Sequence, residues 1–274
     1  MTHPSHLLHA DLTYAIRGVL FDVGNHLGAQ LPEADFQQAV SIGLDKRGIA
    51  HELEREFHVR YRGARVGHYF CDLWVEDVVV LELKVAPEIT NQHRAQTLSY
   101  VRVTGADVGL LAAFGGRVRI ERYANFFAHN RPPFAWQDRT PEDETLLYPE
   151  LVGQIYECLH RVHYELGPGF KHSVYRNAAR LEFNAQSIGC VYLHVLPVTY
   201  EGQIISSRRC FLLVLENKIL LAAFAARDDT PARLEAFETQ MRRYLRYLGK
   251  ELGLLANFHG ERLVVTPVRL GKTV

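Results

Sequence analysis

The sequence has few of the features that mark secreted, membrane-spanning or histidine-ligated metalloproteins. Its four cysteines show no CxxC spacing, and its 14 histidines form no HxxxH or HExxH pattern. No apolar run reaches the roughly 18 residues that a membrane helix needs, and no basic region followed by an apolar run opens the chain. We therefore expect free thiols in a reducing compartment, and a cytoplasmic protein that contacts no membrane.

The sequence also lacks an excess of charge of one sign, because 31 Lys and Arg balance 31 Asp and Glu. A domain that wraps long nucleic acid usually carries a basic excess. Any contact with nucleic acid is therefore expected to be local. A length of 274 residues and a 47% hydrophobic composition are typical of one or two globular domains.

The chain does contain an internal repeat. NHLGAQLPEADFQQAV (25–40) aligns with YELGPGFKHSVYRNAA (164–179), and AQTLSYVRVTGADVGLLAAFGG (95–116) aligns with TQMRRYLRYLGKELGLLANFHG (239–260). Similar segments in the same order indicate a duplicated domain. The stretch between the halves is rich in proline and charge, as linkers are. The pattern predicts one domain over residues 1–126, a linker over 127–147 and a second domain over 148–274, with the two domains packed as the halves of a pseudo-dimer.

Each half is expected to run helix, helix, three strands, helix, two strands. In the first half, apolar spacing predicts helices over 12–28, 33–47 and 91–104. Alternation and apolar runs predict strands over 52–61, 69–75, 79–85, 107–114 and 117–123. This order is typical of an α/β fold in which helices flank a mixed sheet.

In the apolar hairpin FCDLWVEDVVVLELKV (70–85), three charges lie outside the acidic pair of the turn, namely Asp72, Glu82 and Lys84. Side chains alternate between the faces of a strand, so a three-residue turn over 76–78 pairs Asp72 with Glu82 and leaves the other face apolar. Two carboxylates on paired strands have Cβ atoms about 5 Å apart and repel unless a cation lies between them. Oxygen ligands suit Mg²⁺ or Mn²⁺. The alternative is a solvated strand face with a surface Glu–Lys pair.

Asp72 followed by Glu82, Leu83 and Lys84 resembles the motif of the PD-(D/E)XK nucleases. The resemblance implies a Mg²⁺- or Mn²⁺-dependent phosphodiesterase that cleaves nucleic acid, DNA rather than RNA. In such an enzyme Asp72 and Glu82 would bind the metal, together with the Leu83 carbonyl. Lys84 would activate water or offset charge on the scissile phosphate.

Two further elements extend this resemblance. Gly28, Glu33 and Phe36 resemble the G-x-x-E-x-x-Y element of the GxxExxY proteins, with Phe in place of Tyr. Gln96 and Tyr100 resemble the QxxxY motif of a PD-(D/E)XK branch that includes phage-type exonucleases. The resemblance covers about residues 12–123 and, more weakly, 148–270. It implies that Glu33 supports the metal or orients water, and that Gln96 and Tyr100 hold the phosphate, the lysine or a DNA end.

These three residues also have structural explanations. An acid such as Glu33 in the first turn of a helix is favoured by the helix dipole alone. Gln96 and Tyr100 recur in the second half as Gln240 and Tyr244, so the pair can also serve to hold helix to sheet.

The second half keeps the apolar pattern of the hairpin and loses its charges. The alignment places Leu212 at the position of Asp72, Ala222 at that of Glu82, Phe224 at that of Lys84 and His172 at that of Glu33. The fold therefore does not require these charges, and the second domain is predicted to be degenerate. A zero net charge and one degenerate half also allow a non-catalytic module that binds protein or nucleic acid on a relic nuclease fold. The sequence names no protein partner and no oligomeric state.

Overall fold

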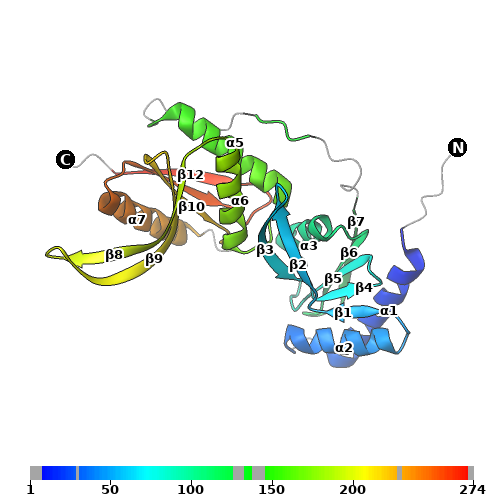
Figure 1. Ribbon diagram of the computed structural model, residues 1–274. Helices are drawn as coiled ribbons and strands as arrows, with labels where there is room; N and C mark the ends of the chain where they lie inside the picture. The colour runs from blue at the N-terminus through cyan, green and yellow to red at the C-terminus, as the bar shows by residue number, and fades with distance from the viewer. Residues whose placement is uncertain (1–7, 29–30, 126–132, 138–145, 227–229, 271–274) are drawn as a thin grey trace. The chain divides into compact units, whose positions relative to one another are not determined.

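The computed structural model describes residues 8–28, 31–125, 133–137, 146–226 and 230–270. The chain forms two compact units (Figure 1). The first comprises Met1–Arg60 and His68–Pro133, and the second comprises Tyr61–Gly67 and Phe134–Val274. Most of the predicted linker lies outside the described residues, at 127–132 and 138–145. The boundaries at 126 and 148 stay a prediction.

The first unit is built on a five-stranded mixed sheet in the order β1-β4-β5-β6-β7. Strands β5 and β6 are parallel, and the other neighbours are antiparallel. Strands β2 and β3 form a separate two-stranded sheet, and its tip, Tyr61–Gly67, is the part that belongs to the second unit. The elements are α1 (Ala10–Leu27), α2 (Glu33–Asp45), β1 (His51–Leu53), β2 (Glu56–Tyr61), β3 (Ala64–Phe70), β4 (Leu73–Val75), β5 (Val79–Lys84), α3 (Asn91–Thr104), β6 (Val108–Ala113) and β7 (Arg119–Ala124).

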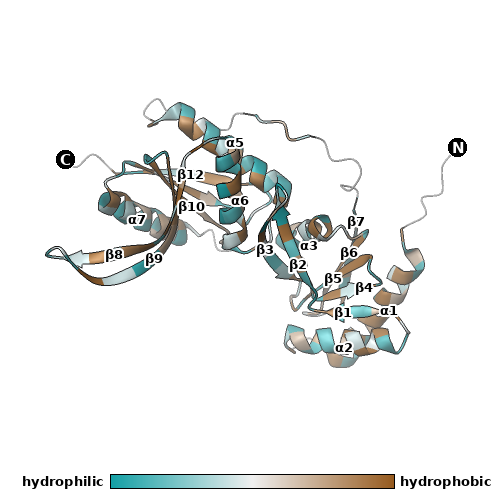
Figure 2. Cartoon of the chain, viewed as in Figure 1, coloured by the Kyte–Doolittle hydropathy of each residue, from teal (hydrophilic) through white to brown (hydrophobic). Residues whose placement is uncertain are grey.

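Helices cover both faces of this sheet. On one face α1 and α2 bury an apolar cluster that includes Ile16, Leu44 and Leu81. On the other face lies α3, which begins with a capping box at Thr90 and ends at Gly105 with φ 73°. Figure 2 shows the central strands as the most hydrophobic part of the unit. A sheet covered on both faces buries the alternating side chains of both.

The hairpin register agrees with the three-residue turn. Val75 pairs with Val79 and Leu73 with Leu81, and the turn residues Glu76 and Asp77 have φ of 49° and 56°. The apolar face predicted from strand parity is therefore the core face.

Two predicted strands are broken, however. The strand expected over 52–61 divides into β1 and β2 at Glu54, where φ is 48°. The strand expected over 69–75 ends at Phe70 as β3 and resumes at Leu73 as β4. Backbone hydrogen bonds join the two breaks, because Glu54 N–H donates to the Asp72 carbonyl. Asp72 consequently lies in a bend and not within a strand.

The second unit repeats this architecture in the strand order β8-β9-β10-β11-β12, with β10 and β11 parallel. Helices α5 and α6 precede the sheet in sequence, and α7 packs against β11 and β12. Strands β8 and β9 form a long hairpin that extends beyond the sheet (Figure 1). The elements are α5 (Pro149–Leu166), α6 (His172–Ala185), β8 (Cys190–Tyr200), β9 (Gln203–Leu215), β10 (Ile219–Phe224), α7 (Pro231–Leu248), β11 (Leu252–Asn257) and β12 (Val264–Arg269).

The two hairpins have the same local geometry. Leu215 pairs with Ile219, as Val75 pairs with Val79, and Glu216 and Asn217 have φ of 49° and 52° in the turn. The structure thus confirms the α/β class, with two five-stranded mixed sheets flanked by helices. It also supports the alignment that equates residue 72 with 212 and residue 82 with 222. All four cysteines are free thiols. None of the described helices is long and apolar enough to cross a membrane.

Candidate active site

Three carboxylates of the first unit converge around one ammonium group. Lys84 Nζ lies 3.5 Å from Glu82 Oε2, 3.8 Å from Glu33 Oε1 and 3.9 Å from Asp72 Oδ2. Glu33 is the first residue of α2, Asp72 lies in the bend before β4, and Glu82 and Lys84 lie on β5. The structure therefore brings together four of the residues that the sequence predicts for the site.

This cluster is buried at one end and open at the other. The exposed fraction of the side chain rises from 3% at Glu82 through 13% at Asp72 and 18% at Lys84 to 40% at Glu33. A Glu–Lys pair on a solvated strand face, the alternative that the sequence left open, is thus excluded. The reason is that α3 covers the face of the sheet that carries Glu82. Solvent reaches the charges from the side of Glu33.

Glu82 is the most constrained member of the cluster. Its Oε1 is buried and has no hydrogen-bond donor among the described residues. Burial raises the pKa of this carboxyl well above its usual value, and the nearby Asp72 carboxylate raises it further. A buried carboxylate oxygen without a donor is costly to keep ionised unless a cation compensates it.

Asp72 is fixed by two hydrogen bonds. Gln37 Nε2 donates to its Oδ1 at 2.8 Å, and the Leu83 backbone N–H donates to its Oδ2 at 2.7 Å. Burial raises the pKa of Asp72, although the Lys84 charge and these hydrogen bonds oppose the shift. Gln37 is not among the residues that the sequence predicts for the site. Its spacing from Glu33 could have indicated it, because Gln37 follows Glu33 by one helical turn and so lies on the same face of α2.

Lys84 holds the position that a cation would take among these oxygens. Its Nζ donates to the Leu83 carbonyl at 2.7 Å, so the ammonium occupies one of the two lone pairs of that oxygen. Burial lowers the pKa of Lys84, but the charges of Glu82, Asp72 and Glu33 outweigh that effect, and the pKa is raised. Burial also raises the pKa of Glu33. The ammonium is therefore the charge that stabilises three crowded carboxyl groups.

The donor set fits a hard divalent cation. It offers carboxylate oxygens of Asp72 and Glu82, one of them without a donor, and a backbone carbonyl. Within the described part of the chain, no three His, Cys, Asp or Glu side chains converge closely enough to hold a metal by themselves. A metal at this position would therefore rely on the Leu83 carbonyl and on water as well as on the two carboxylates, and Mg²⁺ typically retains several waters.

Gln96 and Tyr100 form a separate pair on α3. Gln96 Nε2 donates to the Tyr100 hydroxyl at 2.6 Å and not to one of the four charges. Tyr100 is 7% exposed, and its ring stacks on Tyr69 with centroids 4.0 Å apart. The buried ring contributes to packing between helix and sheet, in line with the structural alternative. A role of the pair toward the phosphate stays a prediction.

Phe36 belongs to the core. It is fully buried and stacks on Phe114 with centroids 4.4 Å apart. Its equivalent in the second unit, Tyr175, stacks in the same way on Phe258 at 4.5 Å. In addition, Gly28 precedes Glu33 by five positions, two more than the G-x-x-E spacing. The resemblance to the GxxExxY proteins is thus not confirmed, and Phe36 has no place among the site residues.

Both halves of the chain match the same known protein family. The model of the PD-(D/E)XK nuclease superfamily matches residues 10–123 and again residues 149–268. No curated protein and no solved structure matches the chain. Two consecutive matches to one family agree with the tandem duplication found in the sequence. The protein accordingly belongs to the PD-(D/E)XK nuclease superfamily and carries two copies of its domain.

Proposed function

We propose that the first half of the chain is a nuclease that depends on Mg²⁺ or Mn²⁺ and hydrolyses phosphodiester bonds, in DNA rather than in RNA. One observation carries this proposal. Glu82 is buried beside Asp72 and Lys84 with one carboxylate oxygen unsatisfied, in a unit that matches a nuclease superfamily. Buried charges of this kind concentrate at functional sites, because their desolvation gives an ordinary core no benefit.

In this proposal Asp72, Glu82 and the Leu83 carbonyl hold the metal. When bound, a divalent ion offsets negative charge on the phosphate and lowers the pKa of a bound water. The hydrogen bonds from Gln37 and from the Leu83 N–H fix Asp72 in place before any ligand arrives. Such preorganisation reduces the cost of assembling the site during the reaction.

The remaining residues act on the proton and on the developing charge. Lys84 stays protonated and, once it leaves the Leu83 carbonyl, offsets charge on the scissile phosphate. Glu33 is the most exposed acid, and its raised pKa makes it a better base toward an attacking water. Gln96 and Tyr100 are proposed to position the phosphate or a DNA end. The balanced net charge favours a local contact with nucleic acid, and we place the activity in the cytoplasm.

A cleavage assay tests this proposal. Purified protein is incubated with Mn²⁺ or Mg²⁺ and single-stranded DNA, duplex DNA or RNA, beside the Glu82→Ala and Lys84→Ala variants. Asp77→Asn is the matched control, because it removes an exposed carboxylate from the turn of the same hairpin. The expected result is cleavage of DNA by the wild type and by the control, and none by the two site variants.

A titration with Mn²⁺ separates metal binding from catalysis. The wild type is expected to bind the ion through the first half, and Glu82→Ala is expected to abolish this binding. Equal Mn²⁺ affinity in wild type and Glu82→Ala would show that the metal ligands are wrongly assigned. Folded wild-type protein that cleaves none of the three substrates would instead favour the non-catalytic binding module.

A further inference from the structure

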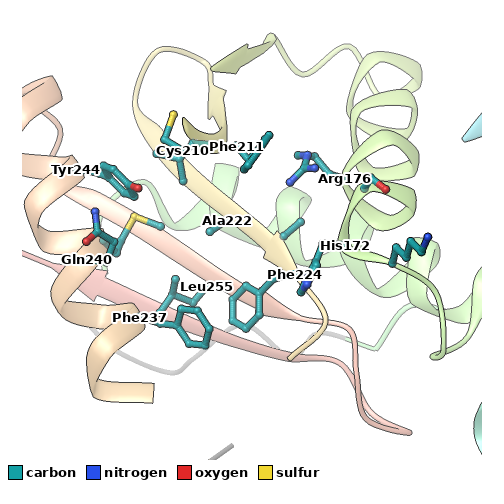
Figure 3. A pocket seen from close by; sticks show the side chains of 15 residues that line it. His172, Arg176, Cys210, Phe211, Ala222, Phe224, Phe237, Gln240, Tyr244 and Leu255 are labelled. Atoms are coloured by element: carbon teal, nitrogen blue, oxygen red, sulfur yellow. The ribbon is translucent and has the colours of Figure 1, made fainter. Parts of the chain in front are cut away.

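The second unit contains a cavity of about 500 Å³ at the position that the charged cluster occupies in the first unit (Figure 3). This volume lies within the range of small-molecule sites. The alignment of the two halves shows the correspondence, because the equivalents of all six candidate side chains line the cavity. These equivalents are His172 for Glu33, Leu212 for Asp72, Ala222 for Glu82, Phe224 for Lys84, Gln240 for Gln96 and Tyr244 for Tyr100.

Most of the cavity wall is apolar and aromatic. Phe224, at the end of β10, and Phe237, on α7, lie with ring centroids 4.6 Å apart. Figure 3 shows both rings at one end of the cavity, with Gln240 and Tyr244 further along α7. Flat aromatic walls of this kind accept ring systems by stacking, with little dependence on which ring is bound.

One buried cation faces this apolar wall. Arg176 is 9% exposed, and its Nε has no hydrogen-bond partner among the described residues. Its guanidinium lies over the Phe211 ring, 4.9 Å from the centroid, and lines the cavity (Figure 3). A buried guanidinium that lines a cavity is a favourable site for a carboxylate or phosphate.

The duplication explains how this cation became available. Arg176 occupies the helix position of Gln37, whose amide holds Asp72 in the first unit. In the second unit Leu212 stands where Asp72 stood, so the side chain on the helix no longer has a carboxylate to hold. The acids Glu33, Asp72 and Glu82 give way to His172, Leu212 and Ala222, and the cation Arg176 stands at the position of the neutral Gln37, so the charge of the site changes from negative to positive. The first unit presents oxygens to a cation, and the second presents nitrogen donors to an anion.

The strand beneath Arg176 departs from regular geometry. Phe211 has φ of 52°, a conformation that costs free energy in a bulky residue. It lies next to a register shift between β8 and β9, and such irregularities redirect side chains. The ring is thereby placed under the guanidinium. This arrangement fixes the orientation of Arg176 toward the cavity.

Two more nitrogen donors stand at the same end of the cavity. The Ala225 backbone N–H donates to His172 Nδ1 at 2.8 Å, which leaves His172 Nε2 to carry the ring proton and act as a donor. Lys171 lines the cavity beside it. Among the described residues of the lining, none is acidic. The cavity therefore combines a cationic end with an aromatic body.

We propose that this cavity binds one nucleotide unit, with its phosphate on Arg176 and His172 and its base against Phe224, Phe237 and Gln240. The unit is either a free nucleotide or the phosphorylated end of a nucleic acid strand. The site lacks the carboxylates of the first unit, so it binds the nucleotide and does not cleave it. This binding is independent of the activity proposed for the first half.

Calorimetric titration of the full chain in EDTA tests the proposal. The probes are deoxyadenosine 5′-monophosphate, a 5′-phosphorylated and an unphosphorylated single-stranded oligonucleotide, deoxyadenosine, inorganic phosphate and octanoate. Arg176→Gln is expected to weaken binding of the nucleotide by about tenfold or more, the loss typical of a charged hydrogen bond. Ala222→Phe is a second variant that fills the cavity and keeps Arg176, and it is expected to abolish binding. Asp77→Asn, on an exposed turn of the other half and outside both proposed sites, is expected to leave binding unchanged.

The probes distinguish a site for free nucleotides from a site for the end of a nucleic acid strand. Binding of the monophosphate identifies a site for free nucleotides, and preference for the phosphorylated over the unphosphorylated oligonucleotide identifies a strand end. The proposal is overturned if inorganic phosphate or octanoate binds as tightly as the nucleotides, or if no phosphorylated probe binds. Binding that survives Ala222→Phe unchanged would likewise place the ligand elsewhere.

Discussion

Lys84 Nζ lies 3.5 Å from Glu82 Oε2, and the two residues stand two positions apart on β5, on one face of the strand. The same ammonium donates to the Leu83 carbonyl between them. The lysine therefore contacts two of the proposed metal ligands, the Glu82 carboxylate and the Leu83 carbonyl. A metal ion bound at the proposed site would compete with the ammonium for the same oxygens, so replacing Lys84 would affect the proposed catalysis and the proposed metal binding differently.

Replacing Lys84 by methionine is expected to preserve metal affinity or increase it, because the competing ammonium is removed while both carboxylates remain. Cleavage is expected to fall by roughly 10²- to 10³-fold, the loss typical of removing one charge-stabilising donor. Parallel Mn²⁺ titration and cleavage assays of Lys84→Met measure the two effects. Loss of Mn²⁺ binding in this variant would contradict the competition.

The raised pKa of Glu82 makes the stability of the metal-free protein depend on pH. Because the pKa is higher in the folded state than the usual 4.5, the folded protein binds more protons than the unfolded chain between those two values. Stability therefore falls as pH rises through this window. Above this pH window, the buried carboxylate is charged, and the full cost of burying that charge lowers the free energy of unfolding.

Glu82→Gln is expected to remove this penalty. In EDTA at about pH 8 the variant should be more stable than wild type, by about 1 to 3 kcal/mol if the penalty is that of an unsatisfied buried group. The difference should shrink toward about pH 4.5, where wild-type Glu82 is protonated. Urea denaturation across this range measures it, with Glu52→Gln on the exposed edge strand as control. A difference that is constant with pH would contradict the assignment.

Phe36, about one helical turn after Glu33 on α2, and its equivalent Tyr175 on α6 are expected to stabilise the cores of their units. Phe36→Ala removes a buried ring stacked on Phe114 and is expected to cost about 3 to 5 kcal/mol in the first unit. Tyr175→Phe keeps its ring and loses the bond from its hydroxyl to the Gly167 carbonyl, at a cost of about 1 to 3 kcal/mol in the second unit.

Hydrogen exchange read separately for each unit measures both losses, because two units need not unfold together. Cleavage by the folded fraction of Phe36→Leu, a milder core substitution, is expected to match wild type. Loss of cleavage without loss of stability in this variant would show that Phe36 contributes to the site as well as to the core.

Strand parity was enough to predict the register of the first hairpin and its apolar face. The turn over 76–78 leaves one arrangement that buries Leu73, Val75 and Leu81 together. Parity says nothing about the other face, so the burial of Glu82 under α3 could not be predicted from the hairpin alone. The bend at Asp72 also escaped prediction, since it depends on pairing with a distant break at Glu54.

The second unit shows a related limit. Aligning the hairpins revealed that the charges were lost, and the sequence therefore predicted a degenerate copy. The positive charge of Arg176 lies on α6, outside the hairpin motif. Its place in the site can be recognised only when the equivalent residue, Gln37, is known to hydrogen-bond Asp72. That contact joins residues 35 positions apart and becomes visible when the fold is built.

Gln96 and Gln240 provide the last prediction, because one glutamine pairs with Tyr100 on α3 and its equivalent on α7 lines the apolar cavity. Gln96 donates to the Tyr100 hydroxyl and is half-buried, so Gln96→Ala is expected to cost about 0.5 to 1.5 kcal/mol of stability. If Gln96 positions the substrate, kcat/KM for DNA should fall by about tenfold or more, which corresponds to about 1.4 kcal/mol. Gln240→Ala is the matched control and is expected to leave cleavage unchanged while weakening nucleotide binding to the second unit. Unchanged cleavage in Gln96→Ala, together with the loss of stability, would identify the pair on α3 as structural.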